Sequence, residues 1–371
     1  MNNIKSFIKK EFTFSIAFIL TLLSIFLNPH ISTYFEMIDF RVLILLFSLM
    51  GISAALESSK AFDALRDFLL KRCDSERSFS LVMIFLTFFA SSLITNDVAL
   101  IIFVPFTLKI VNTLMDVKKS AILIVLETIA ANLGSMMLPV GNPQNLYLYS
   151  TFNLDVKTFF ITILPYSFIS ALLLLGSVFI FFENKKMNFN NQETTLDKKK
   201  ASIFFVLLLF SLLTVFRVVS EYVLIVVVIC AFMLFNKNSF KRVDYILLLT
   251  FCCFFIFSGN LSQNESVKNF FNIVVDKSAF MVSLLTSQII SNVPSAVLLS
   301  QFTSDGIALL VGTNIGGLGT PVASLASLIT IKLYLKNEVK NIKTFLIYFF
   351  IFNIIFLVVL VLFRLIIIYL L

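Results

Sequence analysis

Long apolar runs, separated by short polar gaps, follow one another along the 371-residue chain. Most of these runs approach the ~20 residues that a helix needs to cross the hydrocarbon core of a bilayer. The pattern therefore predicts an all-α polytopic membrane protein. Nine runs are expected to be spans, the third and the eighth of them broken: 12–27, 42–56, 121–149, 159–182, 201–219, 222–235, 245–257, 307–333 and 345–368.

The two broken runs carry Gly, Pro and Asn where a continuous apolar helix would not, and aligning Asn132 with Asn314 superposes these residues. Proline lacks a backbone donor and disfavours helix in the residue before it. Unwound backbone is expected near the glycines Gly134, Gly141, Gly312 and Gly316. Such backbone is tolerated at membrane depth only where protein or a water-filled cavity receives its polar groups. Two broken helices at matching places in two halves indicate the binding site of a transporter.

Two further apolar runs, 79–114 and 279–301, have polar residues in their middles, at 95–97 and 291–294. Each run is expected to stop at this polar tip and turn back as a re-entrant hairpin. Aligning the two runs with a constant offset places Asn96 over Asn292. The mixed polar and apolar stretches before the hairpins, 57–72 and 261–277, are typical of helices that lie along the membrane interface.

These alignments predict an inverted repeat with two re-entrant hairpins and two broken transmembrane helices. Residues 1–182 form the first repeat, with two helices, an interfacial helix, an inward hairpin, a broken helix and a final helix. Residues 183–221 are the linker and the crossover helix, and the single extra crossing makes the second repeat, 222–371, inverted. Lys and Arg crowd alternate gaps, which favours a cell (inner) membrane protein with a cytoplasmic N-terminus.

The net charge of +8 does not indicate a nucleic-acid partner, because the basic residues lie in the gaps between apolar runs. The four cysteines have no metal or redox spacing, and the single histidine, His30, is expected in an outer loop. No catalytic constellation is found, so an enzyme is not expected, nor a cofactor beyond a coupling ion. Composition alone does not exclude a passive channel, although closed hairpin tips favour an occluding transporter.

Four motifs give the chain a resemblance to a known superfamily: TNDVALIIFVP (95–105), ANLGSMMLPVGNPQN (131–145), SNVPSA (291–296) and GTNIGGLGTPVASLASL (312–328). The chain resembles the ion-transporter superfamily of citrate-transporter-like permeases, which includes divalent anion–sodium symporters, arsenite permeases and NhaD-type antiporters. The resemblance implies that hairpin tips and unwound helices meet near the midplane, and it favours a homodimer. The symporters carry Ser-Asn-Thr at both tips, whereas this chain has Asp97 and Val293 at the third position.

The tips and breaks supply the candidate site, because they offer neutral amides, hydroxyls, carbonyls suited to Na⁺ and helix N-terminal amides suited to anion oxygens. The candidate substrate- and ion-binding residues are Thr95, Asn96, Asp97, Asn132, Gly134, Ser135, Gly141, Asn142, Pro143, Ser291, Asn292, Val293, Thr313, Asn314, Gly316, Thr320 and Pro321. Those expected to hold Na⁺ are Asn96, Asp97, Asn132, Asn292 and Asn314. No membrane-embedded Lys or Arg is expected to face these motifs.

Each candidate also has a structural interpretation. An Asn at a tip forms turns, and Asp97 could cap a half-helix that starts at Val98. Asp97 and Glu127 lie deep in apolar segments, where a charged side chain is costly. Such residues are therefore interpreted as functional by default. Asp97 could bind Na⁺ or a coupling proton, and for Glu127 an ion pair or a proton relay is equally open.

Two functions remain. The first is a secondary active transporter, a permease that moves a small anion such as a carboxylate or inorganic oxyanion by alternating access, coupled to Na⁺ or H⁺ symport. The second is a sodium–proton antiporter in which Asp97 is the shared cation site. The expected partners are a small anionic substrate, the lipid bilayer and a second copy of the chain.

Overall fold

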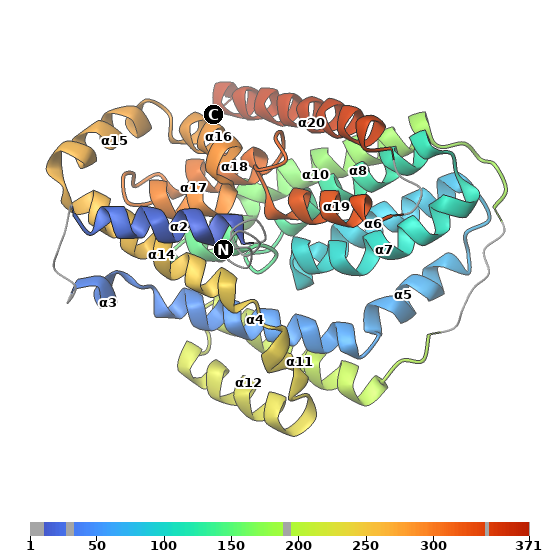
Figure 1. Ribbon diagram of the computed structural model, residues 1–371, viewed down its shortest axis with the longest axis horizontal. Coiled ribbons are helices and arrows are strands. Elements are labelled where there is room, and N and C mark those ends of the chain that lie inside the picture. Colours follow the sequence, from blue (N-terminus) through green and yellow to red (C-terminus); the bar gives the residue numbers. More distant parts are fainter. Residues whose placement is uncertain (1–10, 27–32, 188–193, 338–340, 371) are drawn as a thin grey trace, which may run out of the picture.

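The computed structural model describes residues 11–26, 33–187, 194–337 and 341–370, and within these ranges the chain is helical, without strands (Figure 1). His30 and the first ten residues lie outside the described residues. The helices are α2 (Phe12–Ser24), α3 (Tyr34–Met37), α4 (Phe40–Ser58), α5 (Ala61–Leu70), α6 (Glu76–Ile94), α7 (Asn96–Leu114), α8 (Val117–Ser135), α9 (Pro143–Thr151), α10 (Val156–Phe181), α11 (Lys198–Val215), α12 (Glu221–Phe235), α13 (Asn238–Arg242), α14 (Tyr245–Gln263), α15 (Glu265–Lys277), α16 (Ala279–Ile290), α17 (Asn292–Leu299), α18 (Gly306–Gly316), α19 (Leu325–Leu335) and α20 (Ile342–Leu370).

Five of the described helices, α4, α6, α10, α14 and α20, are long and apolar enough to cross a membrane. A sixth span results if α15 and α16, which meet at 111°, count as one. The chain is therefore a multi-pass membrane protein. The expectation of nine full spans is wrong by length, because α2 and α12 have only 13 and 15 residues. Such helices rise roughly 20 Å, less than the hydrocarbon thickness of about 30 Å.

The two predicted tips are sharp turns between helices. A single residue, Thr95, separates α6 from α7, and its φ and ψ are 75° and 152°. Ser291 separates α16 from α17 with nearly the same values, 76° and 156°. This region of φ and ψ is populated mainly by glycine, and a residue with a side chain adopts it at a cost of about 1–3 kcal/mol. Contacts with neighbouring residues must therefore stabilise both tips. Because α7 begins at Asn96, the expectation that Asp97 caps a helix from Val98 is wrong.

The two predicted breaks are also present, but they begin later than expected. The helix α8 continues to Ser135 and α18 to Gly316, so the non-helical segments are 136–142 and 317–324. Gly134 and Gly316 are helical but lie within two residues of a break, so unwound backbone is found near them. Of the four glycines, Gly141 lies within a break, whereas Gly312 lies inside α18, where the expectation is wrong.

The helical glycines instead allow close helix packing. A Cβ atom on Gly134 would meet the carbonyl oxygen of Phe88 and the hydroxyl of Ser91 on α6. A Cβ atom on Gly316 would meet Ser287 on α16. The position that a Cβ would occupy is taken in each case by atoms of the neighbouring helix. α8 therefore packs closely on α6, and α18 packs closely on α16.

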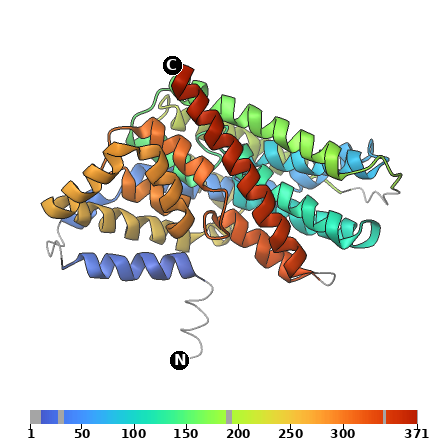
Figure 2. The same ribbon diagram turned by 90° about the horizontal axis from the view of Figure 1, so that it is seen from above.

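The helix contacts of the chain come in matching pairs (Figure 1). α6 packs on α8 as α16 packs on α18, and α7 packs on α19 as α17 packs on α9. Likewise α2 packs on α14, and α4 packs on α12. The long helix α20 crosses the molecule diagonally and contacts both α8 and α18 (Figure 2). Every residue of α8 from Ser120 to Ser135 is buried, so this helix lies at the centre of the fold.

The glycine contact is open to a direct test. Gly134→Ala should lower the free energy of unfolding by about 1–3 kcal/mol, because the added methyl overpacks the α6–α8 contact. The matched control is Gly176→Ala in α10, where an added Cβ meets nothing within 4 Å and stability should not fall. Thermal unfolding of both variants in detergent makes the comparison, and equal midpoints would contradict the close contact.

Candidate functional site

The two breaks meet through side chains that cross between the halves of the chain. Asn142 donates from Nδ2 to Oδ1 of Asn314 at 3.2 Å, and Ser324 donates from Oγ to Oδ1 of Asn132 at 2.8 Å. Asn142 is the N-cap of α9 and Ser324 is the N-cap of α19. Each capping residue therefore contacts the asparagine in the last turn of the other half's helix.

Further buried amides extend this network within the first break. Asn314 donates from Nδ2 to Oδ1 of Asn145 at 2.6 Å, and Asn142 donates to Oγ of Ser135 at 3.1 Å. Asn145 in turn donates to the carbonyl oxygen of Met136 at 3.1 Å. Buried polar groups of this kind are stable only when they are paired, so the amides fix the relative position of α8, α9 and α18.

Both tip asparagines hydrogen-bond to a break. The backbone N–H of Asn96 donates to the carbonyl of Gly141 at 3.3 Å, and that of Asn292 donates to the carbonyl of Ala323 at 3.0 Å. Asn96 also donates from Nδ2 to Oδ1 of Asn132 at 3.3 Å. Within the described part of the chain, Nδ2 of Asn132 is buried and has no hydrogen-bond partner, so a donor remains free where the tip, α8 and α19 meet.

Gln288, which sequence reasoning did not select, holds the second break together. Its Nε2 donates to the carbonyl oxygens of Gly316 and Leu318 at 2.8 and 2.9 Å, and its Oε1 accepts from the N–H of Thr320 at 3.0 Å. These carbonyls were expected to be open to Na⁺, and they are occupied by a side chain instead. A single glutamine within an apolar run, three residues before the tip, was the available signal.

A cavity of about 410 Å³ adjoins the first tip and the first break. Its polar lining near the network consists of Thr95, Asp97 and Asn142. Oδ1 of Asp97 is buried, and among the described residues it has no hydrogen-bond partner. The cavity therefore presents an acceptor at the tip, close to the amide network. We refer to it as the tip cavity.

The mouth of the tip cavity carries charges that sequence reasoning missed. Arg242 and Glu57 both line it and form an ion pair, with Nη1 and Oε2 3.0 Å apart, and Asp244 lies beside them. Arg242 is about half-exposed and lies outside the predicted apolar runs, so the expectation that no membrane-embedded Lys or Arg faces the motifs is not contradicted by it. Arg242 belongs to a polar gap in the sequence, and only the packing of α13 on α4 brings it to the cavity.

The second tip lines a smaller cavity of about 280 Å³, which contains Ser291 and Val293. Val293 occupies the place that corresponds to Asp97, so this tip offers no carboxylate. The two cavities share Asp244, Leu247 and Leu325. The first tip therefore carries a carboxylate and the second does not, although Glu11, Asp244 and Lys332 also line the second cavity.

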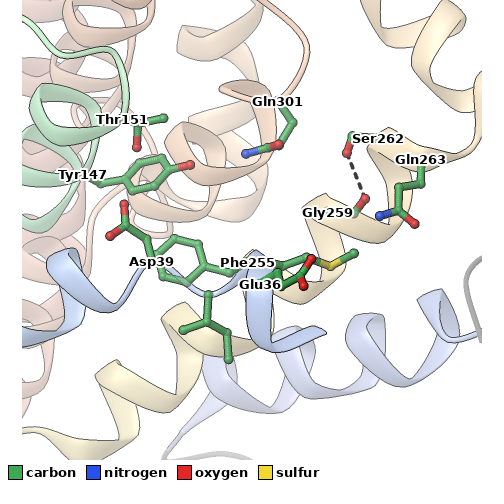
Figure 3. Close-up of a pocket in the computed structure, with 11 residues that line it drawn as sticks. Glu36, Asp39, Tyr147, Thr151, Phe255, Gly259, Ser262, Gln263 and Gln301 are labelled. Carbon is green, nitrogen blue, oxygen red and sulfur yellow. Dashed lines mark hydrogen bonds between the residues drawn. The ribbon is translucent and has the colours of Figure 1, made fainter. Parts of the chain in front are cut away.

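A third cavity, of about 440 Å³, lies at the opposite ends of α9 and α14 (Figure 3). Asp39, Tyr147, Thr151 and Gln301 point toward one another there. The hydroxyls of Tyr147 and Ser300 are 2.7 Å apart, which links α9 to the residue after α17. Because Asn142 lines the tip cavity and Tyr147 lines this one, α9 connects two cavities that the network separates.

The structure does not bring every predicted site residue to the network. Thr313 bonds back to the carbonyl of Leu309 on its own helix at 2.8 Å. Gly134 and Gly316 serve helix packing, and Thr320 lies with Pro321 in the break beside Gln288. The described residues hold no cluster of three or more His, Cys, Asp or Glu. The binding role of the candidate residues stays a prediction.

Known proteins match the chain over most of its length. The sequence profile described as citrate transporter matches residues 7–305. An uncharacterized transporter of Methanocaldococcus jannaschii is 36% identical over 321 residues, 86% of this chain and 87% of that protein. The inner membrane protein YbiR of Escherichia coli is 29% identical over 300 residues, 80% of each chain. The silicon efflux transporter LSI3 of Oryza sativa is 31% identical over 128 residues, 34% of this chain and 26% of that protein.

The network can be tested by removing its central amide. Asn314→Ala should lower the free energy of unfolding by about 1–3 kcal/mol, because it leaves Oδ1 of Asn145 buried without a donor. Thr313→Val is the matched control, since the lost hydroxyl bonds only to carbonyls of its own helix. Thermal unfolding should therefore separate the two neighbouring variants, and a Thr313→Val loss as large as that of Asn314→Ala would refute the network.

Proposed function

Because the chain belongs to the citrate transporter family, we propose that this membrane transporter moves a small anion by alternating access, coupled to Na⁺ or H⁺. The family and the relatives are transporters, which is in line with a non-enzymatic role. The substrate that we propose is a carboxylate or an inorganic oxyanion. One relative is a silicon efflux transporter, which adds an inorganic solute to the candidates.

One observation carries this proposal: residues of both halves meet at a buried amide network that borders a cavity. Asn132, Asn142 and Asn314 combine acceptors and donors, and the free Nδ2 of Asn132 lies among them. Neutral amides of this kind can bind the oxygens of a small anion. Helix N-termini at α9 and α19 add a favourable dipole for negative charge.

The charges of the tip cavity favour coupling to a cation. Glu57, Asp97 and Asp244 line it, against the single guanidinium of Arg242. A bare anion is repelled by such a surface, whereas a bound Na⁺ or H⁺ at Asp97 offsets the repulsion. We therefore propose that the cation binds at the tip before or together with the anion.

We propose that the chain is an inverted repeat whose two re-entrant hairpins and two broken helices form the moving site. The matching helix contacts, the equal backbone angles of Thr95 and Ser291, and the crossed hydrogen bonds support this. The cavities at the two ends of α9 are the proposed openings to the two sides of the membrane. Such broken-helix repeats are typical of secondary transporters.

The proposed setting is the cell membrane, with a cytoplasmic N-terminus and the tip cavity facing the cytoplasm. Arg242, at the mouth of the tip cavity, belongs to a gap rich in Lys and Arg. The cavity with Asp39 would then face outward. A homodimer is the proposed assembly.

A second candidate function is supported by Asp97. A carboxylate with a buried, unpaired oxygen at the end of a cavity is suited to exchange Na⁺ for H⁺. A sodium–proton antiporter needs only such a shared site and no anion. Asp97 is therefore the residue that separates the two functions.

The first experiment measures thermal unfolding in detergent across Na⁺, Li⁺, K⁺ and pH, with citrate, arsenite, phosphate and silicic acid. We expect one anion to stabilise the protein, and to do so more strongly in Na⁺ or at low pH. A ligand at 100 times its Kd adds about 2.7 kcal/mol to the stability of the folded state. Stabilisation by cations alone, with no response to any anion, would favour the antiporter.

The second experiment uses Asp97→Asn in liposomes. If the protein is an antiporter, this change should abolish proton movement driven by a Na⁺ gradient, because the shared carboxylate is lost. If it is an anion transporter, exchange of labelled anion across the membrane should persist while the dependence on the cation changes. Na⁺-driven proton movement that survives in Asp97→Asn would falsify the antiporter.

A further inference from the structure

Three carboxylates of the described residues are deeply buried, and Glu127 differs from the other two. Oε1 of Glu76 lies 2.8 Å from Nζ of Lys119, and Oδ1 of Asp67 lies 2.7 Å from Nη2 of Arg66. Glu127 has no side-chain exposure and no cation beside it in the described structure. Its Oε1 accepts from the hydroxyl of Thr107 at 2.7 Å, and its Oε2 is buried without a hydrogen-bond partner in the part of the chain described.

Glu127 lies beside the proposed site without belonging to it. It is in the middle of α8, five residues before Asn132, which is about 7.5 Å along the helix axis. Thr107 lies on α7, whose first turn carries Asp97. The Glu127–Thr107 pair therefore joins α7 and α8, the helices that also carry Asp97 and Asn132.

No charged group compensates Glu127 from the surrounding helices, as far as the described residues reach. The helices packed against α8 are α6, α7, α10, α18, α19 and α20. Their charged and titratable side chains, with those of α8 itself, are Glu76, Arg77, Asp97, Lys109, Lys118, Lys119, Lys157, Tyr166, Lys332, Tyr334, Lys343, Tyr348, Arg364 and Tyr369. In the described structure none of them forms an ion pair or hydrogen bond with Glu127. Its polar partner there is Thr107.

An unpaired carboxylate in such surroundings is costly, so this conformation favours the carboxylic acid. Losing the proton requires that water or another partner reach Oε2, and hence that α7 and α8 open. Protonation of this group is thus linked to conformation. That is the property a proton-coupled transporter needs, and it is independent of how the anion is bound.

We propose that Glu127 takes up and releases the proton that is coupled to transport, and that Thr107 orients its carboxyl group. In the step, hydronium on one side gives up a proton, which forms the O–H bond at Oε2 and leaves a water molecule. The same bond breaks when the group reaches water on the other side, and Glu127 returns to its carboxylate. This assignment rests on the proposed transporter function and names H⁺ as its coupling ion.

The test is Glu127→Gln, which keeps the shape and the hydrogen bond to Thr107 but cannot ionise. Purified protein in liposomes carries a trapped pH-sensitive dye, and citrate and arsenite are the two probes. Exchange of labelled probe between equal concentrations inside and outside reports binding and conformational cycling. We expect Glu127→Gln to keep this exchange, and to lose the dye signal that a probe gradient produces in the wild type.

Each outcome decides something different. If the Glu127→Gln variant moves protons as the wild type does, the proposed role of Glu127 is overturned and the proposed transporter function stands. Absence of probe exchange in the wild type instead overturns the proposed function, and the inference with it.

A second pair of variants keeps the proposal testable should Glu127→Gln not fold. Thr107→Val removes the hydrogen bond from Thr107 to Glu127, whereas Thr107→Ser keeps a hydroxyl. We expect the pH at which coupled transport is half-maximal to move in Thr107→Val and to stay unchanged in Thr107→Ser. Identical pH profiles for both variants and the wild type overturn the proposal.

Discussion

Backbone that leaves a helix inside a membrane must find partners within the protein, and this constraint shapes the centre of the molecule. Side chains hydrogen-bond to the backbone of the breaks at 136–142 and 317–324. Asn145 bonds to carbonyls of the first break, and Gln288 bonds to those of the second. The two N-cap residues hydrogen-bond to the other half of the chain, Asn142 to Asn314 and Ser324 to Asn132. The two halves therefore complete each other's hydrogen bonding, which places polar groups of both at one point.

The sequence predicts the helical architecture well, because the length of an apolar run and its charged flanks are local properties. It also predicts the turns at Thr95 and Ser291, since a polar triplet in the middle of an apolar run favours a turn that protein surrounds over a helix that faces lipid. It places the breaks too early, because glycine can either end a helix or let two helices touch. Gly134 and Gly316 do the second, and only the partner helix reveals this.

The missed residues depend on contacts between distant segments. Arg242 reaches the tip cavity because α13 packs on α4, and nothing near it in the chain indicates that. Gln288 binds a break some thirty residues away. Ser324 was within reach of the alignment, since it follows Asn314 at the distance at which Asn142 follows Asn132. Serine and asparagine can both cap a helix N-terminus, but an alignment that looks for identical residues does not pair Ser324 with Asn142.

The glycine contacts have a mechanical consequence. Helices packed this closely cannot slide past one another by exchanging rotamers, because only small side chains such as Ser91 and Ser287 lie between them. α6 with α8, and α16 with α18, are thus stiff paired units. Rearrangement is left to surfaces that larger side chains separate, such as the one that Leu46, Leu49 and Leu247 line in the tip cavity. In the proposed transport cycle, shear along that surface would move each tip and its break as one body, so that the proposed binding groups keep their mutual geometry while access to them changes.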